Sequence, residues 1–187
     1  MRKLAALPAL CLAALLGGCA SDALSGPAIQ AIFAEGLKDY DSGNYEAAYK
    51  KWSSIDDMDL AAMRNVGAML RTGKGVPKDP KAALGMLTRA AKAGLFTAQA
   101  DVGDMLLKGE AGPPDPKAAA PWLAMAARAG HPMAQYQLGQ LYEQGLGVPK
   151  DIEAARALYT AAAAGGVADA GGRLETLPPK PSPALRH

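Results

Sequence analysis

The sequence predicts an all-α fold in which helix hairpins stack into a solenoid. Three observations support this prediction: small residues recur at a fixed spacing, apolar residues follow a helical period within each copy, and glycine, proline and aspartate mark the breaks. The chain has 187 residues, enough for one domain with a buried core. Each copy would be one hairpin, and the core would form where neighbouring copies stack.

The repeat has a period of 36 residues. Gly67, Gly103 and Gly139 are separated by this spacing. Five further sets keep the same register: Gly73, Gly109 and Gly145; Asp79, Asp115 and Asp151; Ala90, Ala126 and Ala162; Gly94, Gly130 and Gly166; and Ala62, Ala98, Ala134 and Ala170. The last set extends into a fourth, incomplete copy. A fixed period of this length indicates a solenoid.

Each copy is predicted to be a pair of helices. In the third copy, Ala134, Leu138 and Leu141 fall on one face of a helix. Residues 145–149 interrupt that helix, and Asp151 is placed to cap a second helix through its side-chain oxygen. In the first two copies a proline follows the aspartate, where its fixed φ suits the first helical residue.

Small residues within these helices predict close packing. The glycine at position 103 and its two counterparts cost about 1 kcal/mol of helix propensity each, so we expect another helix to pack against them. Gly94 and Gly130 stand where the second helices should end in a left-handed residue. Trp52, Trp122 and Tyr159 recur on the second helices, and we interpret them as core residues rather than ligand platforms.

Residues 1–18 have the features of a lipoprotein signal peptide. A short basic region precedes an apolar run from Leu4 to Leu16, which is shorter than the ~20 residues of a membrane-spanning helix. The run ends in Leu16-Gly17-Gly18-Cys19, which resembles the lipobox of bacterial lipoproteins. The alternative is an ordinary signal peptide with a chance cysteine; it is disfavoured because the only other cysteine, Cys11, lies inside the leader. We therefore expect acylation of Cys19, by palmitate or a similar chain.

The mature chain would be neutral and anchored in a membrane. Removing Arg2 and Lys3 lowers the 20 basic residues to 18, which equals the 18 acidic residues, so nucleic acid is not an expected partner. Resemblance to lipoproteins of two-membrane bacteria implies the periplasmic face of the outer membrane. The inner membrane is less favoured because Ala20, not aspartate, follows the cysteine. Residues 19–27 would comprise the lipidated cysteine and a tether that reaches at most ~26–29 Å.

The third copy resembles a Sel1-like repeat, the 36-residue relative of the tetratricopeptide repeat. It reads Ala134-Gln-Tyr-Gln-Leu-Gly139-Gln-Leu-Tyr142 and ends in Gly145-Leu-Gly147-Val-Pro-Lys-Asp151. Residues 61–95 and 97–131 match the same pattern, and residues 35–52 resemble the tetratricopeptide-type hairpin that often precedes such repeats. The resemblance covers residues 28–177. It implies a right-handed superhelix with one tetratricopeptide-like hairpin, three Sel1-like repeats and a short capping helix, whose first helices line a concave surface.

The middle copy departs from this pattern. Its loop, Gly109-Glu-Ala-Gly-Pro-Pro-Asp115, shifts the second glycine and adds Pro114. Pro121 falls within the second helix, where we expect it to kink or delay the helix because proline removes a backbone hydrogen bond. The stack is therefore expected to bend there. Residues 178–187 are rich in proline and are predicted to form a disordered tail.

No residue pattern predicts catalysis. His131 precedes Pro132 in a turn with no cysteine or carboxylate at ligand spacing, so we interpret it as a loop residue rather than a metal ligand or a catalytic base. Asp79, Asp115 and Asp151 lie on successive loops, and helix capping accounts for them. The Gly-x-Gly elements lie between helices rather than after a strand, as a phosphate-binding loop would. We expect no enzymatic activity, no cofactor, no metal and no small-molecule substrate.

The positions that vary between copies on the first helices predict the partner-binding surface. They are Arg64, Ala68 and Arg71 in the first copy, Ala100, Asp104 and Leu107 in the second, and Tyr136, Gln140 and Glu143 in the third. Their charges suggest a gradient from a positive to an acidic end, which would orient an elongated partner. For any single position a solvated face is an equally good interpretation.

Three classes of function remain open. The leading one is a scaffold that binds another periplasmic or outer-membrane protein through the concave groove, in envelope assembly. The second is an immunity lipoprotein that neutralises a periplasmic toxic effector such as a lipase. The third is a cell-wall-related enzyme or penicillin binder, suggested by a cysteine-rich subgroup of the family. The mature chain lacks the cysteine pairs of that subgroup, which disfavours the third class.

Overall fold

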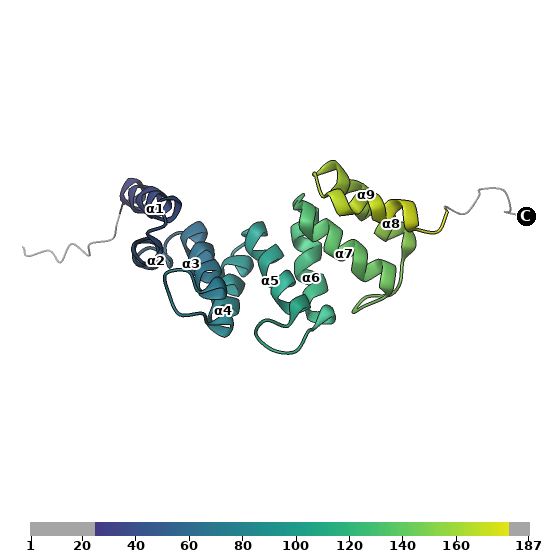
Figure 1. The fold of residues 1–187 in the computed structure, drawn as a ribbon, viewed down its shortest axis with the longest axis horizontal. Helices are drawn as coiled ribbons and strands as arrows, with labels where there is room; N and C mark the ends of the chain where they lie inside the picture. The colour runs from purple at the N-terminus through teal and green to yellow at the C-terminus, as the bar shows by residue number, and fades with distance from the viewer. Residues whose placement is uncertain (1–24, 180–187) are drawn as a thin grey trace, which may run out of the picture.

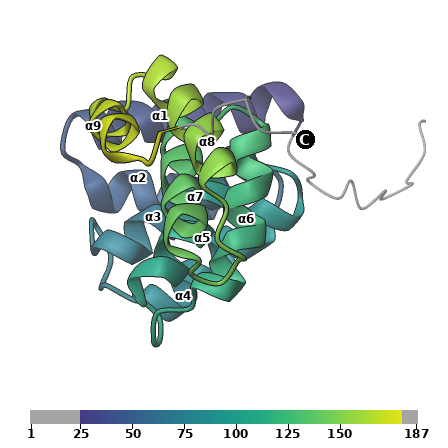
Figure 2. The same ribbon diagram turned by 90° about the vertical axis from the view of Figure 1, so that its right-hand side faces the viewer.

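Residues 25–179 are described by a computed structural model, in which they fold into nine α-helices and no β-strand. The helices follow one another along an arc from α1 to α9 (Figure 1), and from the α9 end they overlap as one stack (Figure 2). They are α1 (Gly26–Asp41), α2 (Tyr45–Ser53), α3 (Leu60–Thr72), α4 (Pro80–Lys92), α5 (Phe96–Lys108), α6 (Pro116–Arg128), α7 (Pro132–Gln144), α8 (Ile152–Ala164) and α9 (Ala168–Thr176). None of these helices combines the length and the hydropathy needed to cross a bilayer. The predicted all-α solenoid is confirmed.

The helices pack as hairpins whose members follow one another in the chain. The tightest packing joins α3 to α4, α5 to α6 and α7 to α8, and α1 packs on α2 in the same way. We call α1, α3, α5, α7 and α9 the first helices, and α2, α4, α6 and α8 the second helices. The first helices follow the inner side of the arc (Figure 1). α1 begins at Gly26, so the last two residues of the predicted tether belong to a helix, capped by the side chain of Ser25.

The predicted caps set the boundaries of the second helices. The side chains of Asp79, Asp115 and Asp151 each accept a hydrogen bond from a backbone N–H three residues later, at 2.9 Å. Each cap satisfies one of the N–H groups that a helix start leaves without a partner. Gly94 and Gly130 have φ values of +98° and +86°, so the left-handed turn predicted after α4 and α6 is confirmed.

The glycine in each first helix lies against a large side chain of the second helix. A Cβ at Gly103 would lie 2.5 Å from Cδ2 of Leu123, and one at Gly139 would lie 2.8 Å from Cε1 of Tyr159. Gly36 and Gly67 make the same contact, with Trp52 and Leu87. The glycine therefore lets each pair of helices approach closely, as predicted.

Two of the three aromatic residues assigned to the core are buried there. Trp52 and Tyr159 fill the space beside a helix glycine, whereas Trp122 is half-buried. Leu123 takes the place of an aromatic residue in the middle repeat and is fully buried. Trp122 packs against the hydrophobic core from its half-buried position, so it belongs to the border of the core rather than to its centre.

Pro121 does not delay its helix. α6 begins at Pro116, in the same place as α4 begins at Pro80, and it runs for 13 residues, as α4 and α8 do. Pro121 lies on the exposed side, in the second turn, where the carbonyl that loses its partner belongs to the exposed Lys117. Water can satisfy that carbonyl, so the cost of proline is low at this position.

The solenoid ends in a helix that has no second helix. Glu175 of α9 stands where the other repeats have the packing glycine, and it is exposed. A carboxylate at this position prevents a further helix from packing, because burying it without a partner is costly. Leu177 instead folds back into the core beside Tyr159, so α9 serves as the predicted cap.

His131 caps the start of α7. Its Nδ1 accepts a hydrogen bond from the backbone N–H of Ala134 at 3.2 Å, and its ring lies 6.3 Å from that of Phe96. Burial lowers the pKa of His131, with a further contribution from Arg64. Only the neutral ring can accept this bond, so both effects favour the neutral form in the folded protein.

We expect His131 to make the protein less stable in weak acid. The pKa of His131 in the folded protein lies below the unfolded value of about 6.5. The contribution of His131 to the free energy of unfolding is therefore complete above that pH and is lost as the pH falls through the folded pKa. His131→Asn keeps an acceptor that does not titrate. The melting temperatures of both forms at pH 7.5 and 5 test this: the wild type should lose more, by roughly 1 kcal/mol. Equal losses would contradict the capping role.

Candidate partner-binding face

The candidate site is the face that the first helices form along the inner side of the arc. α5 packs directly on α7, and side chains bridge the first helices of successive repeats. Nearly all of the residues predicted to contact a partner lie on this face, on α3, α5 and α7. Those that pair with other side chains of the protein are not available to a partner.

A polar ladder fills the middle of this face. Arg64 Nε donates to Asp101 Oδ2 at 2.7 Å, which joins α3 to α5. Arg71 pairs with Asp104 on α5 and with Glu110 in the following loop. The network continues to α7, because Nε2 of Gln137 donates to Oδ1 of Asp104 at 2.7 Å. We call these six residues the ladder.

The ladder is half-buried, and its Arg71, Asp104 and Glu110 side chains are held in their charged forms. The side chains of Arg71 and Asp104 are each 18% exposed. Hydrogen bonds from Arg71 lower the pKa of Glu110 and hold the guanidinium in its charged form. Burial would raise the pKa of Asp104, but hydrogen bonds from Lys108, Arg71 and Gln137 outweigh it and keep that pKa below its ordinary value.

The predicted charge gradient along this face is wrong. Arg64 and Arg71 at the positive end are paired with carboxylates of α5 and the loop after it. At the acidic end, Glu143 accepts a hydrogen bond from the hydroxyl of Tyr159 at 2.6 Å and lies 3.8 Å from Arg173. Each of these charges is paired with a neighbour on another helix or loop, so they do not form a row of free charges along the groove.

Two grooves stay open at the ends of the face. The N-terminal groove lies between α1 and α3 and has a volume of about 270 Å³; Leu37, Tyr40, Arg64 and Ala68 line it. The C-terminal groove lies between α7 and α9 and has a volume of about 470 Å³. Tyr136 lines it from α7, and Ala168, Asp169, Gly172, Arg173 and Thr176 line it from α9. The gaps between first helices are thus bridged by the ladder in the middle and open at both ends.

The predicted binding residues therefore separate into groups. Arg64 and Tyr136 line the two open grooves, and Arg71 and Asp104 belong to the ladder. Leu107 packs against the hydrophobic core of the second and third repeats, and Gln140 is half-buried. Ala100 is only 6% exposed, so its assignment to the partner-binding face was wrong. Cys19 lies outside the described residues.

The sequence interpretation missed the residues of the first and last helices. Leu37 is the most exposed large apolar side chain on this face, at 45%, and it stands on α1. Its register is hidden because Gly36 and Gly67 are 31 rather than 36 residues apart. Arg173 lies on α9, one residue beyond the place where Tyr136 would recur. Taking Gly36 as the packing glycine of α1 would have located Leu37. Following the alanine series to Ala170 on α9 would have located Arg173.

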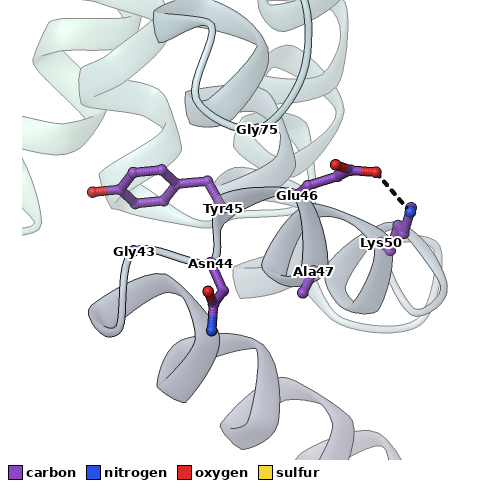
Figure 3. Close-up of a pocket in the computed structure, with 7 residues that line it drawn as sticks. All are labelled: Gly43, Asn44, Tyr45, Glu46, Ala47, Lys50 and Gly75. Carbon is purple, nitrogen blue, oxygen red and sulfur yellow. Dashed lines mark hydrogen bonds and ion pairs between the residues drawn. The ribbon is translucent and has the colours of Figure 1, made fainter.

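A further hollow lies at the edge of the solenoid where the second helix α2 begins. It has a volume of about 610 Å³ and is open to solvent, and Gly43, Asn44 and Gly75 border it (Figure 3). Glu46 and Lys50 are its charged residues, and they pair with each other at 2.7 Å. Within residues 25–179 no group of His, Cys, Asp and Glu side chains could hold a metal ion. The hollow offers no set of groups for chemistry.

We expect removal of Arg71 to destabilise the stack. Arg71→Met keeps the length of the side chain but leaves Glu110 without its cation and Asp104 with Lys108 alone, and for a half-buried network this should cost about 1–3 kcal/mol. Denaturant midpoints measure the loss. Lys50→Met, which breaks a fully exposed pair, is the matched control and should change little.

The loss of stability caused by Arg71→Met should also depend on pH. The lowered pKa values of Asp104 and Glu110 mean that their contribution is present above about pH 4 and is lost as the pH falls through the folded values. The difference between wild type and Arg71→Met should therefore shrink at pH 3. A difference that stays constant with pH would contradict the ion-pair origin.

Stacked helix hairpins with an inner face of first helices define an α-solenoid repeat protein. Residues 60–95, 97–131 and 132–167 match the Sel1 repeat family, and the chain belongs to that family. The predicted resemblance and the predicted fold class are confirmed. No curated protein matches the chain significantly.

Several solved structures are similar. A Sel1 repeat protein from Oxalobacter formigenes is 32% identical, with a TM-score of 0.70 over 76% of this chain and 58% of that one. A protective antigen of uropathogenic Escherichia coli is 28% identical, with a TM-score of 0.72 over 78% of this chain and 32% of that one. An immunity protein of Pseudomonas aeruginosa is 26% identical, with a TM-score of 0.55 over 82% of this chain and 60% of that one. The chain thus spans about a third to three fifths of the length of these relatives.

Proposed function

We propose that the protein is a lipid-anchored interaction scaffold that binds another periplasmic or outer-membrane protein through the first-helix face. One observation carries this proposal: the ladder saturates the middle of the face, while the two grooves beside it keep exposed side chains in open pockets. Half-buried, fully paired groups make poor binding sites because a partner would have to replace their hydrogen bonds. A partner therefore contacts the two grooves.

Each groove offers the features of an interface anchor site. The N-terminal groove combines the apolar Leu37 with the ring of Tyr40. The C-terminal groove combines Tyr136 with Arg173. Tyrosine and arginine are enriched among the residues that dominate binding energy, and a concave pocket lets them bury area at small cost in entropy. An elongated partner that reaches both grooves uses the full length of the arc.

Lipid attachment at Cys19 and residence on the periplasmic face of the outer membrane form part of this proposal. Their support is the tetrapeptide Leu16-Gly-Gly-Cys19 behind an apolar leader, and Ala20 after it. The tether is then six residues, from Ala20 to Ser25, and reaches about 20 Å at most. The partner is therefore a protein that comes close to the membrane.

Site-specific photo-crosslinking in living cells tests the position of the binding face. A photoreactive amino acid at Leu37 or at Tyr136 should yield the same adduct with one envelope protein. The control positions are Gly85 and Ala161, which are exposed on the second helices α4 and α8. Adducts that form only from the control positions would place the site on the outer face and refute the proposal.

The second candidate function is immunity against a toxic effector in the periplasm. The likeness to the immunity protein of Pseudomonas aeruginosa favours it, since the alignment extends over 82% of this chain. The same crosslinking experiment separates the two functions through the identity of the adduct. A structural envelope protein supports the scaffold. A secreted enzyme whose activity falls when the purified chain is added supports immunity.

A further inference from the structure

Large apolar side chains gather along the edge of the solenoid at which the first helices begin. Leu60, Phe96 and Met133 occupy the first turns of α3, α5 and α7, and Met58 lies in the turn before α3. Their exposed fractions are 37%, 41%, 47% and 49%. Only Leu37 and Leu146 are comparable among large apolar residues in the part of the chain that the structure describes. We call these four residues the apolar edge.

The apolar edge runs across three repeats. Leu60 and Phe96 are 36 residues apart and hold the same place in successive repeats. The ring of Phe96 lies 6.3 Å from that of His131, which precedes Pro132 and Met133 in the next repeat. Single exposed apolar residues are ordinary, whereas a row of them on one edge indicates a surface that is covered in use.

The chain leaves the described structure toward Cys19 at this same edge. Successive helices are joined by short turns and alternate in direction, so α1 begins at the edge where α3, α5 and α7 begin. Ser25 lies six residues after Cys19 in the sequence, and this stretch spans at most about 20 Å. An acylated Cys19 therefore holds the apolar edge beside the bilayer. The opposite edge is farther away by the length of a 13-residue helix, about 20 Å.

We propose that the apolar edge docks on the surface of the lipid bilayer, with its four side chains at the boundary between headgroups and acyl chains. This inference rests on the proposed lipid attachment at Cys19. Two exposed cations support it: Lys92 and Arg128 end α4 and α6 on the same edge and contact lipid phosphates. Two of the acidic residues nearby are engaged within the protein: Asp57 pairs with Arg89, and Asp59 caps α3.

Docking by this edge sets the direction in which the binding face points. The first-helix face is bounded by this edge and by the opposite one, so it stands upright on the membrane when the apolar edge lies flat. The two grooves then open sideways, toward proteins in or on the same membrane. The anchor thus orients the solenoid as well as retaining it.

The test uses the lipidated full-length protein, reconstituted into vesicles of phosphatidylethanolamine and phosphatidylglycerol with brominated acyl chains, which quench tryptophan at contact. Phe96→Trp places the reporter on the apolar edge, and Leu146→Trp places it on the opposite edge at a similar exposure of 46%. Both variants carry the same added ring, so the preference of tryptophan for interfaces cancels. Circular dichroism verifies that both keep the parent fold.

We expect the Phe96→Trp signal, after subtraction of the parent, to be quenched at least about two-fold more than that of Leu146→Trp. Equal quenching, in vesicles that carry the protein when they float in a density gradient, would overturn the docking and leave the anchor standing. A protein without acyl chains on Cys19 by mass spectrometry, and absent from the floated vesicles, would overturn the anchor and the docking together.

Discussion

Gly103→Leu should destabilise the protein by about 1–3 kcal/mol or more, although leucine is the better helix former. The reason is the contact between α5 and α6: a Cβ at position 103 would lie 2.5 Å from Cδ2 and 2.6 Å from Cγ of Leu123. Leu123 is fully buried in the core. The two helices would have to separate, and this would also disturb their interfaces with both neighbouring repeats. Denaturant unfolding of wild type and variant measures the effect as a lower midpoint.

Gly85 supplies the matched control for this substitution. It lies within α4, and nothing comes within 4 Å of the place where its Cβ would stand. Gly85→Ala should therefore stabilise the protein by about 0.5–1 kcal/mol, because only helix propensity changes. Opposite signs for the two positions are the expected pattern. A stabilising Gly103→Leu would show that the first and second helices do not pack through the glycine.

Cys19→Ser should leave the protein without its lipid and keep it out of the outer membrane. The proposed anchor depends on one sulfur atom, since serine cannot form the thioether that carries the lipid and the processing of lipoproteins requires the modified cysteine. In fractionated cells, the wild type should sediment with outer membranes as a shortened, acylated chain. The variant should accumulate as the uncleaved precursor.

Cys11→Ser is the control, because it also removes a cysteine but lies in the discarded leader. This variant should be cleaved, acylated and sorted like the parent. If Cys19→Ser were cleaved normally and still sedimented with outer membranes, the lipobox interpretation would be wrong. Acylated protein in the inner-membrane fraction would instead correct the proposed destination.

The fold could be predicted because packing repeats the same local requirement every 36 residues. Each of the three 36-residue repeats has a glycine opposite a bulky side chain and an aspartate at the start of its second helix. These requirements leave marks in the sequence that do not depend on distant contacts. The one local rule that failed concerned Pro121, since the cost of proline depends on whether water reaches the carbonyl that loses its partner.

The candidate site could be predicted only in part. The variable positions lie on the face that the repeat assigned to them, but their pairing is not visible in the sequence. Arg64 joins Asp101 across 37 residues and Arg71 joins Asp104 across 33, so neither pair follows the period. Whether a charged side chain faces a partner or a neighbouring repeat depends on the stagger between helices. The N-terminal groove was missed because α1 stands outside the 36-residue register, and the C-terminal groove because its residues on α9 do not repeat those of the earlier first helices.

The most direct test of the proposed function is the affinity of the crosslinked partner for groove variants. Leu37→Asp and Tyr136→Ala each change one groove, and Leu146→Asp places the same charge on a loop outside the face. Isothermal titration calorimetry on purified full-length proteins should show at least about a ten-fold weaker Kd for each groove variant and a larger loss for both together, with Leu146→Asp unchanged. Full affinity in the double groove variant, with unchanged helical circular dichroism, would contradict binding through the first-helix face.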